Sequence, residues 1–309
     1  NLYKQHDYDY IFIDEASMID EDDFYCLQSL RSKVVFIGDS YQLPPVGERN
    51  SIVFDRVQYV ARLTETVRTS HDALQDVYNQ FRNYVYNDTE LELDNNDHLT
   101  VVETRSDFYK VISENFKQGV SCKVIAYRNV MVDRYNQYVR TILFKSDDLY
   151  VPGEQLIFTQ QYGDVYTNNT EVVVKSVNII DKAHPQTGHV YQVYELTLEN
   201  DDVLHKVTEK SKLKYNDYFN GMLHDVKSSF VKNKSRKWAK YYQQRFAFDP
   251  PIVYSYALTA YKCQGSTIDT TFIDLDDVYH CMVDKDDLVM KKAMYTSITR
   301  ASNKLYILL

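Results

Sequence analysis

Two short apolar runs near the start of the chain, each ending in acidic residues, place the strongest constraint on the fold. The first run, Tyr10 to Ile13, leads into Asp14 and Glu15, and the second, Val35 to Ile37, leads through a glycine into Asp39. Such runs are typical of strands buried in a parallel sheet, and the carboxyl ends of parallel strands meet at one edge of the sheet. The pattern therefore predicts an α/β fold with acidic side chains gathered at that edge.

The adjacent pair Asp14 and Glu15 suits nucleotide hydrolysis. One carboxylate can hold a magnesium ion that bridges phosphate oxygens, while the other orients the attacking water. The alternative is a buried strand that ends in solvated acids. Because two such segments follow one another in this order, we favour a nucleotide site.

Three further segments complete a series of motifs. They run from Leu63 to Ser70, from Tyr256 to Ser266 and from Met294 to Ala301. Read in order with the two acidic segments, the series resembles the motifs of superfamily 1 DNA helicases, and most closely the RecD-like branch with its small Dda-like helicases of bacteriophages. The resemblance covers nearly the whole chain, with a weakly matching middle. It implies an ATP-dependent helicase or translocase that moves 5′ to 3′ on single-stranded DNA.

One motif of that series is missing from the chain. Such helicases carry a phosphate-binding loop of the form G-x-x-x-x-G-K-S/T, whose backbone amides and lysine cradle the nucleotide phosphates. None of the 8 glycines is followed by a lysine, and the chain starts at Asn1 rather than at a methionine. We therefore expect the carboxyl-terminal part of a helicase, which by itself hydrolyses ATP poorly or not at all.

The resemblance also implies a domain organisation. Residues 1–70 would be the second half of a first RecA-like domain, whose incomplete sheet should leave an exposed surface. Residues 71–158 and 247–309 would form a second RecA-like domain. Residues 159–246 would be an inserted SH3-like β-barrel followed by a basic and aromatic tract.

Local patterns support elements in the second half of this scheme. Ser106 can cap a helix that runs to about Lys117, and Asn129 to Phe144 has the spacing of an amphipathic helix. Glu171 to Ile180 and His189 to Leu198 are rich in β-branched and aromatic residues, which favours a pair of strands in the insert.

The resemblance implies roles for individual residues around ATP and Mg²⁺. Asp14 would be the metal ligand, Glu15 the base for the attacking water, and Gln42 the sensor of the terminal phosphate. Arg68 and Arg300 would be arginine fingers, which neutralise charge on the transferring phosphoryl group. The alternatives are a turn-stabilising amide for Gln42 and surface ion pairs for the arginines. The ATP-binding set comprises Asp14, Glu15, Gln42, Arg68, Gly265 and Arg300.

Contacts to DNA would come mainly from the segment that resembles the fifth motif. Hydroxyl, amide and ammonium groups bind phosphates without reading bases. Tyr261 stands where many RecD-like enzymes carry histidine, so a role that needs a charged ring is in doubt. Tyr295 matches an aromatic residue often found near the last motif, although a packed core tyrosine fits equally well. The predicted DNA contacts are Thr259, Tyr261, Lys262, Gln264, Ser266, the loosely aligned Asn129, and Trp238.

Trp238 belongs to a tract whose charge differs from that of the chain. The net charge of −9 argues mildly against a nucleic-acid binder if the charge is evenly spread, but residues 227–245 contain lysines, arginines and aromatic rings and no acid. Alternating cations and rings suit single strands, where phosphates meet cations and bases stack on rings. The alternative is an amphipathic helix with a solvated basic face and aromatic residues packed inward.

Composition also indicates the compartment in which the protein works. The 4 cysteines show neither metal-binding spacing nor a framework of bridges, which fits a reducing cytoplasm, and no run is long or apolar enough to span a membrane. We expect a monomer that works in the cytoplasm on single-stranded DNA, with replication or recombination proteins as candidate partners. Two other classes stay open: a remnant that binds single-stranded nucleic acid without hydrolysis, and a viral-type RNA helicase.

Overall fold

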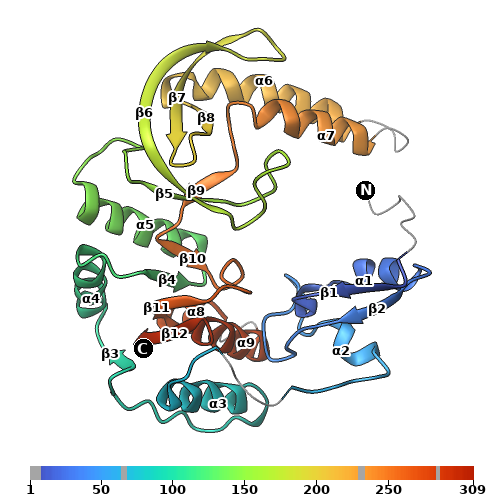
Figure 1. Ribbon diagram of the computed structural model, residues 1–309, viewed down its shortest axis with the longest axis vertical. Helices are drawn as coiled ribbons and strands as arrows, with labels where there is room; N and C mark the ends of the chain where they lie inside the picture. The colour runs from blue at the N-terminus through green and yellow to red at the C-terminus, as the bar shows by residue number, and fades with distance from the viewer. Residues whose placement is uncertain (1–7, 64–67, 229–233, 283–285) are drawn as a thin grey trace. The chain divides into compact units, whose positions relative to one another are not determined.

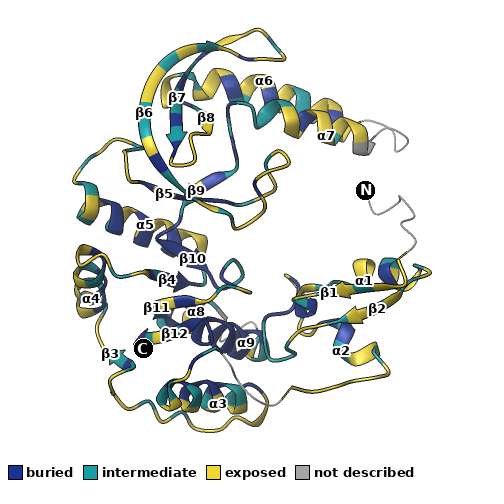
Figure 2. Ribbon diagram, viewed as in Figure 1, coloured by how far each residue is buried: buried dark blue, intermediate teal, exposed yellow. Residues whose placement is uncertain are grey.

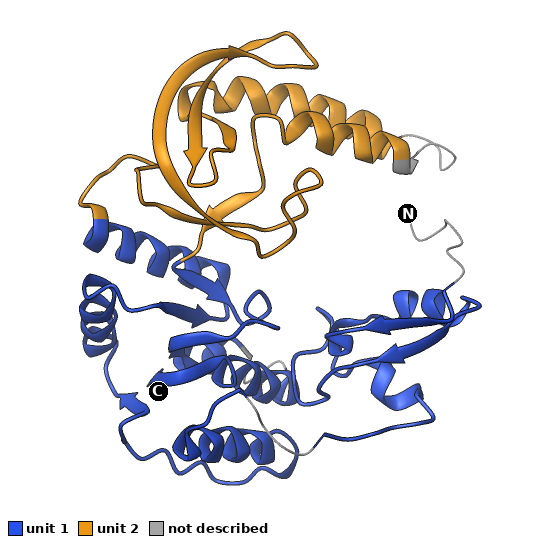
Figure 3. Ribbon diagram, viewed as in Figure 1, with its two compact units in different colours: residues 1–143, 256–309 blue, residues 144–255 orange. Residues whose placement is uncertain are grey.

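The chain folds into two compact units. The computed structural model describes residues 8–63, 68–228, 234–282 and 286–309. One unit comprises residues 1–143 and 256–309, and the other comprises residues 144–255 (Figure 3). Among the described residues, no helix has the length and apolar character needed to cross a membrane.

The larger unit contains a five-stranded parallel sheet with the strand order β10-β4-β11-β12-β3 (Figure 1). The central strand β11 is buried along nearly all of its length, as expected of a parallel strand covered on both faces (Figure 2). The α/β class and the parallel sheet predicted from the sequence are therefore confirmed. The strands are β3 (Leu99–Val102), β4 (Cys122–Ala126), β10 (Ala257–Thr259), β11 (Ile268–Asp274) and β12 (Ala301–Leu308).

Helices cover this sheet. Helix α9 is buried from Val289 to Ile298 and packs against α3, α8 and β11. Helix α5 lies along the edge strand β10, where the Asn136 amide exchanges two hydrogen bonds with the backbone of Ala257, of 2.9 and 3.3 Å. That pairing satisfies an edge that would otherwise be open. The helices are α3 (Asp72–Asn87), α4 (Arg105–Lys117), α5 (Asn129–Phe144), α8 (Leu275–Met282) and α9 (Asp287–Ile298).

The predicted cap of α4 is wrong by two residues. Thr104, not Ser106, has the extended backbone of an N-cap, and its hydroxyl accepts a hydrogen bond from the Asp107 amide at 3.1 Å. Ser106 already lies inside the helix. The sequence alone allows either hydroxyl to cap the helix. The helix begins soon after β3 ends at Val102, which makes Thr104 the cap.

The first part of the larger unit is a two-stranded parallel sheet, β1 (Tyr10–Ile13) with β2 (Lys33–Phe36). A short helical turn, η1 (Ala16–Met18), follows β1, and α1 (Glu21–Gln28) and α2 (Ile52–Arg56) pack with it around a small core. The side chains of Tyr10 and Phe12 are exposed on the sheet. An exposed surface on this sheet was expected from the sequence, whereas the incompleteness of the sheet stays a prediction.

The smaller unit is built on an antiparallel sheet with the order β8-β7-β6-β5-β9. Helices α6 and α7 pack with β7 and β8 around a second, largely aromatic core. The predicted insert, 159–246, lies inside this unit, which also contains β5 and β9. Its SH3-like character and the predicted domain boundaries stay predictions. The elements are β5 (Gln155–Phe158), β6 (Glu171–Ala183), β7 (Val190–Leu198), β8 (Val203–Val207), α6 (Glu209–Lys227), α7 (Lys234–Arg245) and β9 (Ile252–Tyr254).

Candidate active site

The acidic pair lies in a tight turn directly after β1. Glu15 adopts a left-handed backbone conformation with φ of 52°, and its amide donates to Asp14 Oδ1 at 2.8 Å. The next amide, of Ala16, donates to the carbonyl of Ile37 at 2.9 Å, which ties the turn to the end of β2. A non-glycine residue in this conformation costs on the order of 1–3 kcal/mol and persists only where its surroundings hold it.

Gly38 allows the two strand ends to approach. A Cβ atom at this position would lie 2.9 Å from the amide nitrogen of Ala16 and 3.1 Å from that of Ser17. Both neighbours are backbone atoms, which cannot move aside cheaply. Any side chain here would therefore push the acidic turn away from β2.

Two residues from far along the chain close on Glu15. The Gln264 amide donates to the Ser17 hydroxyl at 2.7 Å and to Glu15 Oε2 at 3.5 Å. Gly265 has φ of +78°, and a Cβ atom there would lie 3.2 Å from Glu15 Oε1. Gln264 is only 7% exposed, and its Oε1 is buried without a hydrogen-bond partner. The structure thus turns Gln264, predicted as a DNA contact, toward the acidic turn.

The two predicted arginine fingers meet at Thr299. Arg68 donates from Nη1 to the Thr299 carbonyl at 2.5 Å, and Arg300 donates from Nη2 to the Thr299 hydroxyl at 3.0 Å. Arg300 is 0% exposed, and its other nitrogens donate to the carbonyls of Thr296 and Ser266. Within the described part of the chain, neither arginine forms a salt bridge.

The charge of Arg300 is buried among hydrogen-bond acceptors. Burial and the positive charge of Arg68 lower the pKa of Arg300, while the negative charge of Glu15 acts in the opposite direction. A buried charge has to be hydrogen-bonded or paired, and each of the three guanidinium nitrogens of Arg300 donates to a protein oxygen. Two cations and one carboxylate therefore influence one another at the end of α9.

The segment that carries Gln42 is fastened to α9. The amide of Leu43 donates to the Thr296 hydroxyl at 2.9 Å, and the Tyr295 hydroxyl donates to Asp39 Oδ2 at 2.9 Å. The backbone amide of Gln42 donates to the Asp39 carbonyl at 3.1 Å. The side-chain Oε1 of Gln42 is buried without a hydrogen-bond partner. An unsatisfied buried acceptor is what a ligand donor or a bound water would complete.

Several residues of this site were not predicted. Ser17, Thr296 and Thr299 supply the hydrogen bonds that hold Gln264, Leu43 and the two arginines. Ser17 stands in the D-E-x-S pattern, and both threonines lie in the last motif, so their motif positions were the available signal. Residues 64–67 of the Arg68 motif lie outside the described residues.

The chain is similar in sequence to several known proteins. A family model for an AAA domain matches residues 2–104. The chain is 24% identical to the ATP-dependent DNA helicase dda of Enterobacteria phage T4, over 94% of this chain and 73% of that protein. It is 23% identical to the uncharacterized protein R530 of Acanthamoeba polyphaga mimivirus, over 96% of this chain and 73% of that protein.

Solved structures show a similar fold. The Pif1 helicase of Bacteroides in complex with ADP-AlF3 and ssDNA has a TM-score of 0.54 and 15% identity, with 97% of this chain and 70% of that chain covered. The Pif1 helicase of Candida albicans has a TM-score of 0.53 and 14% identity, with 97% and 71% covered. The chain is thus similar in sequence to the helicase dda and in fold to Pif1 helicases. Its RecA-like α/β fold is thereby confirmed.

The residues present fit a nucleotide with its magnesium ion. Asp14 offers a carboxylate at a strand end, and the amide oxygens of Gln42 and Gln264 are buried without partners. No cluster of three or more candidate metal ligands exists among the described residues. Magnesium fits nevertheless, because it commonly binds one or two carboxylates together with substrate phosphates and water.

The other predicted DNA contacts lie near the end of β10, at the start of α5 and in α7. Thr259, Lys262 and Ser266 form the turn after β10, where the Lys262 amide donates to the Thr259 hydroxyl and the Ser266 hydroxyl to the Cys263 carbonyl. The ring of Tyr261 lies 6.4 Å from that of Tyr127, which follows the neighbouring strand β4. Burial raises the pKa of Tyr261, so its hydroxyl stays protonated at neutral pH.

Asn129 and Trp238 complete the predicted set. Asn129 is exposed at the start of α5. Trp238 lies in α7 of the smaller unit, stacked on Tyr242 at 5.6 Å and packed against the aromatic core, as the inward-facing alternative predicted. Residues 229–233 of the basic tract, which include Lys232, lie outside the described residues.

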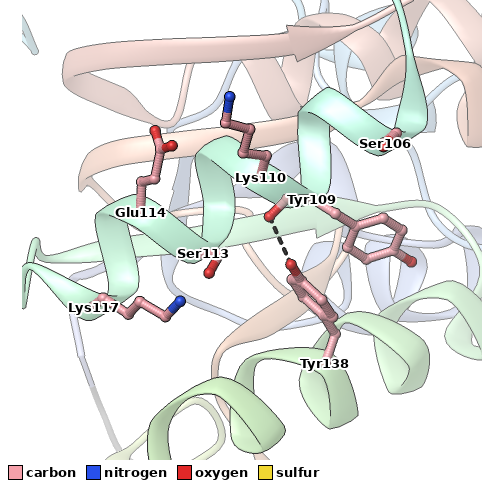
Figure 4. A pocket seen from close by; sticks show the side chains of 7 residues that line it. All are labelled: Ser106, Tyr109, Lys110, Ser113, Glu114, Lys117 and Tyr138. Atoms are coloured by element: carbon pink, nitrogen blue, oxygen red, sulfur yellow. Dashed lines mark hydrogen bonds between the residues drawn. The ribbon is translucent and has the colours of Figure 1, made fainter.

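A hollow between α4 and α5 lies apart from the predicted site residues. It has a volume of about 580 Å³, and Ser106, Lys110, Glu114 and Tyr138 are among its lining residues (Figure 4). The Tyr138 hydroxyl donates to the Tyr109 carbonyl at 2.9 Å across it. None of the residues predicted to bind ATP or DNA lines this hollow, so we place no function there.

Proposed function

We propose that this protein is part of an ATP-driven DNA helicase or translocase that works on single-stranded DNA. The observation that carries the proposal is the meeting of Arg68 and Arg300 at Thr299, without a salt bridge among the described residues, beside the Glu15 turn. Phosphoryl transfer uses guanidinium groups that neutralise charge on the transferring group and a residue that orients the attacking water. The names of the relatives, an ATP-dependent DNA helicase and Pif1 helicases, agree with it.

Each residue has a role in this proposal. Asp14 holds the magnesium ion, which neutralises phosphate charge when it is bound. Glu15 orients the attacking water and accepts its proton, while Arg68 and Arg300 neutralise the transferring group. Gln42 contacts the terminal phosphate. Gly265 leaves room for Glu15, and Gln264 ties Glu15 to the segment after β10.

The turn after β10 would connect this chemistry to DNA. Thr259, Tyr261, Lys262 and Ser266, together with Asn129, would contact a single strand that moves 5′ to 3′ through the protein. A monomer acting in the cytoplasm, in replication or recombination, fits this activity.

A phosphate-binding loop has to come from outside these 309 residues, because no glycine among them precedes a lysine. This absence favours a second candidate function, the binding of single-stranded nucleic acid without hydrolysis. The two candidates differ in one measurable property, the turnover of ATP.

The test is ATP hydrolysis with and without a single-stranded oligonucleotide. It compares the 309-residue protein with a longer version that also carries a phosphate-binding loop. We expect DNA-stimulated hydrolysis by the longer version only. We also expect Glu15→Gln to abolish it while ATP binding remains, with Glu21→Gln, an exposed acid on α1, as the matched control. Binding of single strands without hydrolysis by either protein would select the second candidate, and turnover by the Glu15→Gln variant would remove Glu15 from its role.

A further inference from the structure

A buried carboxylate holds the turn between β4 and α5. Asp277, on α8, accepts hydrogen bonds at Oδ2 from the backbone amides of Tyr127 and Arg128, both at 2.9 Å. Its Oδ1 accepts from Arg128 Nε at 2.5 Å. The Asp277 side chain is 0% exposed, whereas the Arg128 side chain is 49% exposed. One carboxylate therefore fixes both the backbone of the turn and the direction of an exposed cation.

Asp277 is itself held in place by a second buried acid. Its amide donates to Asp274 Oδ1 at 3.0 Å. The other oxygen of Asp274 accepts from the Tyr135 hydroxyl and from Arg105 Nη1, both at 2.7 Å. The charge of Asp274 is thus paired and hydrogen-bonded, as a buried acid must be. This network gives Asp277 a rigid base.

The turn presents groups that suit a phosphate. Arg128 uses Nε for Asp277, and within the described part of the chain its two terminal nitrogens have no partner. Asn129 follows with an exposed amide at the first position of α5. The guanidinium fork matches phosphate oxygens, and the first turn of a helix adds unpaired backbone amides.

The turn also lies beside the predicted DNA contacts. Strands β4 and β10 are parallel neighbours, so the turns that follow them share one edge of the sheet. The Tyr127 and Tyr261 rings, 6.4 Å apart, connect the two turns, and Lys262 adds a second cation there. Both turns can therefore contact the backbone of one DNA strand.

We propose that Asp277 is a positioning residue that fixes Arg128, with Asn129, to hold one phosphate of a single-stranded DNA. The inference rests on the proposed function only for the identity of the ligand, and it needs no ATP turnover. Arg128 makes the contact. Asp277 acts through Arg128 and touches no ligand.

The test is the salt dependence of binding to a fluorescent oligothymidine. One phosphate contact in a single strand contributes a slope of about −0.7 in log affinity against log salt, or roughly fourfold in affinity at 0.15 M salt. We expect Arg128→Gln to remove that slope and that affinity. Asp277→Asn should produce most of the same change, and the double variant should bind no worse than Arg128→Gln alone.

Asp276→Asn is the matched control, because Asp276 is an acid on the same helix that pairs with Arg105 and His280 rather than with the turn. It should leave the salt slope unchanged. Thermal unfolding of each variant separates folding from binding. A salt slope unchanged in folded Arg128→Gln would overturn the proposal, as would additive losses in the double variant. If ATP hydrolysis fails but the slopes change as expected, the helicase proposal falls and this one stands.

Discussion

The Tyr295 hydroxyl donates a hydrogen bond to Asp39 Oδ2 across 2.9 Å, and so joins α9 to the segment that carries Gln42. The next residue on the helix, Thr296, holds the amide of Leu43 in the same segment. Burial and the neighbouring Asp39 raise the pKa of Tyr295, so the hydroxyl remains a donor at neutral pH. The segment that carries Gln42, the proposed phosphate sensor, is therefore hydrogen-bonded to the helix that leads to Arg300.

Tyr295→Phe removes this connection and little else. Asp39 loses a donor in a partly buried place, which costs about 1–3 kcal/mol of unfolding free energy. We expect a lower rate of DNA-stimulated ATP hydrolysis in the longer version, with ATP binding retained. Tyr279→Phe, on the exposed side of α8, is the control and should change neither property. Equal hydrolysis by both variants would show that the hydrogen bond does not couple the two segments.

Replacement of either arginine by lysine keeps the charge but loses the planar fork of donors. In the phosphate-loop version, Arg300→Lys and Arg68→Lys should each lower the rate of hydrolysis, by up to about 10³-fold where the finger acts in the transition state. Because both guanidinium groups act on one phosphoryl group, the double variant should be little worse than the single ones. Arg62→Lys, an exposed arginine, is the control. Full activity in folded Arg300→Lys would contradict the assignment.

Gly265→Ala tests the space around Glu15. Gly265 and Gly163 both have positive φ, +78° and +60°, but only at Gly265 would a Cβ atom meet a neighbour, Glu15 Oε1 at 3.2 Å. Alanine at either position should cost about 1–2 kcal/mol of stability through backbone strain. Only Gly265→Ala should also slow ATP hydrolysis in the longer version, because it displaces Glu15. Equal hydrolysis by the two variants would mean that Glu15 tolerates the added methyl group.

The lowered pKa of Lys292 predicts that the free energy of unfolding rises with pH above neutrality. Burial lowers its pKa from 10.5 to about 8, although its ammonium donates to Asn50 Oδ1 at 2.7 Å. Between those two pH values the unfolded chain keeps the proton that the folded protein has released, so the free energy of unfolding increases with pH, by about 1 kcal/mol from pH 8 to pH 9. Denaturant unfolding at both pH values should show this increment in the wild type and not in Lys292→Met. Lys110→Met, an exposed lysine on α4, should keep the increment; its persistence in Lys292→Met would assign it to another group.

Local signals in the sequence predicted local structure well. The spacing of apolar residues gave the range of α5, Asn129–Phe144, and the apolar runs ending in acids placed Asp14 and Glu15 after a parallel strand. Both outcomes depend on neighbours in the sequence. The N-cap of α4 depends instead on where β3 releases the chain, which the choice between Thr104 and Ser106 does not reveal.

Contacts between segments that are distant in the sequence could not be predicted from it. Gln264 was predicted to touch DNA because its segment resembles a DNA-contacting motif, and that contact stays a prediction. Its contacts with Ser17 and Glu15, some 250 positions earlier in the chain, were not predicted. The direction of a side chain in a turn is decided by what packs against that turn. The inward packing of Trp238 has the same cause, since the aromatic core of the smaller unit decides which face of α7 is buried.

The antiparallel pairing of β5 with β9 means that the smaller unit begins and ends at one point. Leu156 pairs with Tyr254, and the Ser255 amide donates to the Gln155 carbonyl at 3.1 Å. If residues 156–254 were excised, the cut ends would already lie within hydrogen-bonding reach, and a two-residue hairpin turn could join them. A short connection could therefore replace residues 156–254 without stretching the chain on either side of the cut.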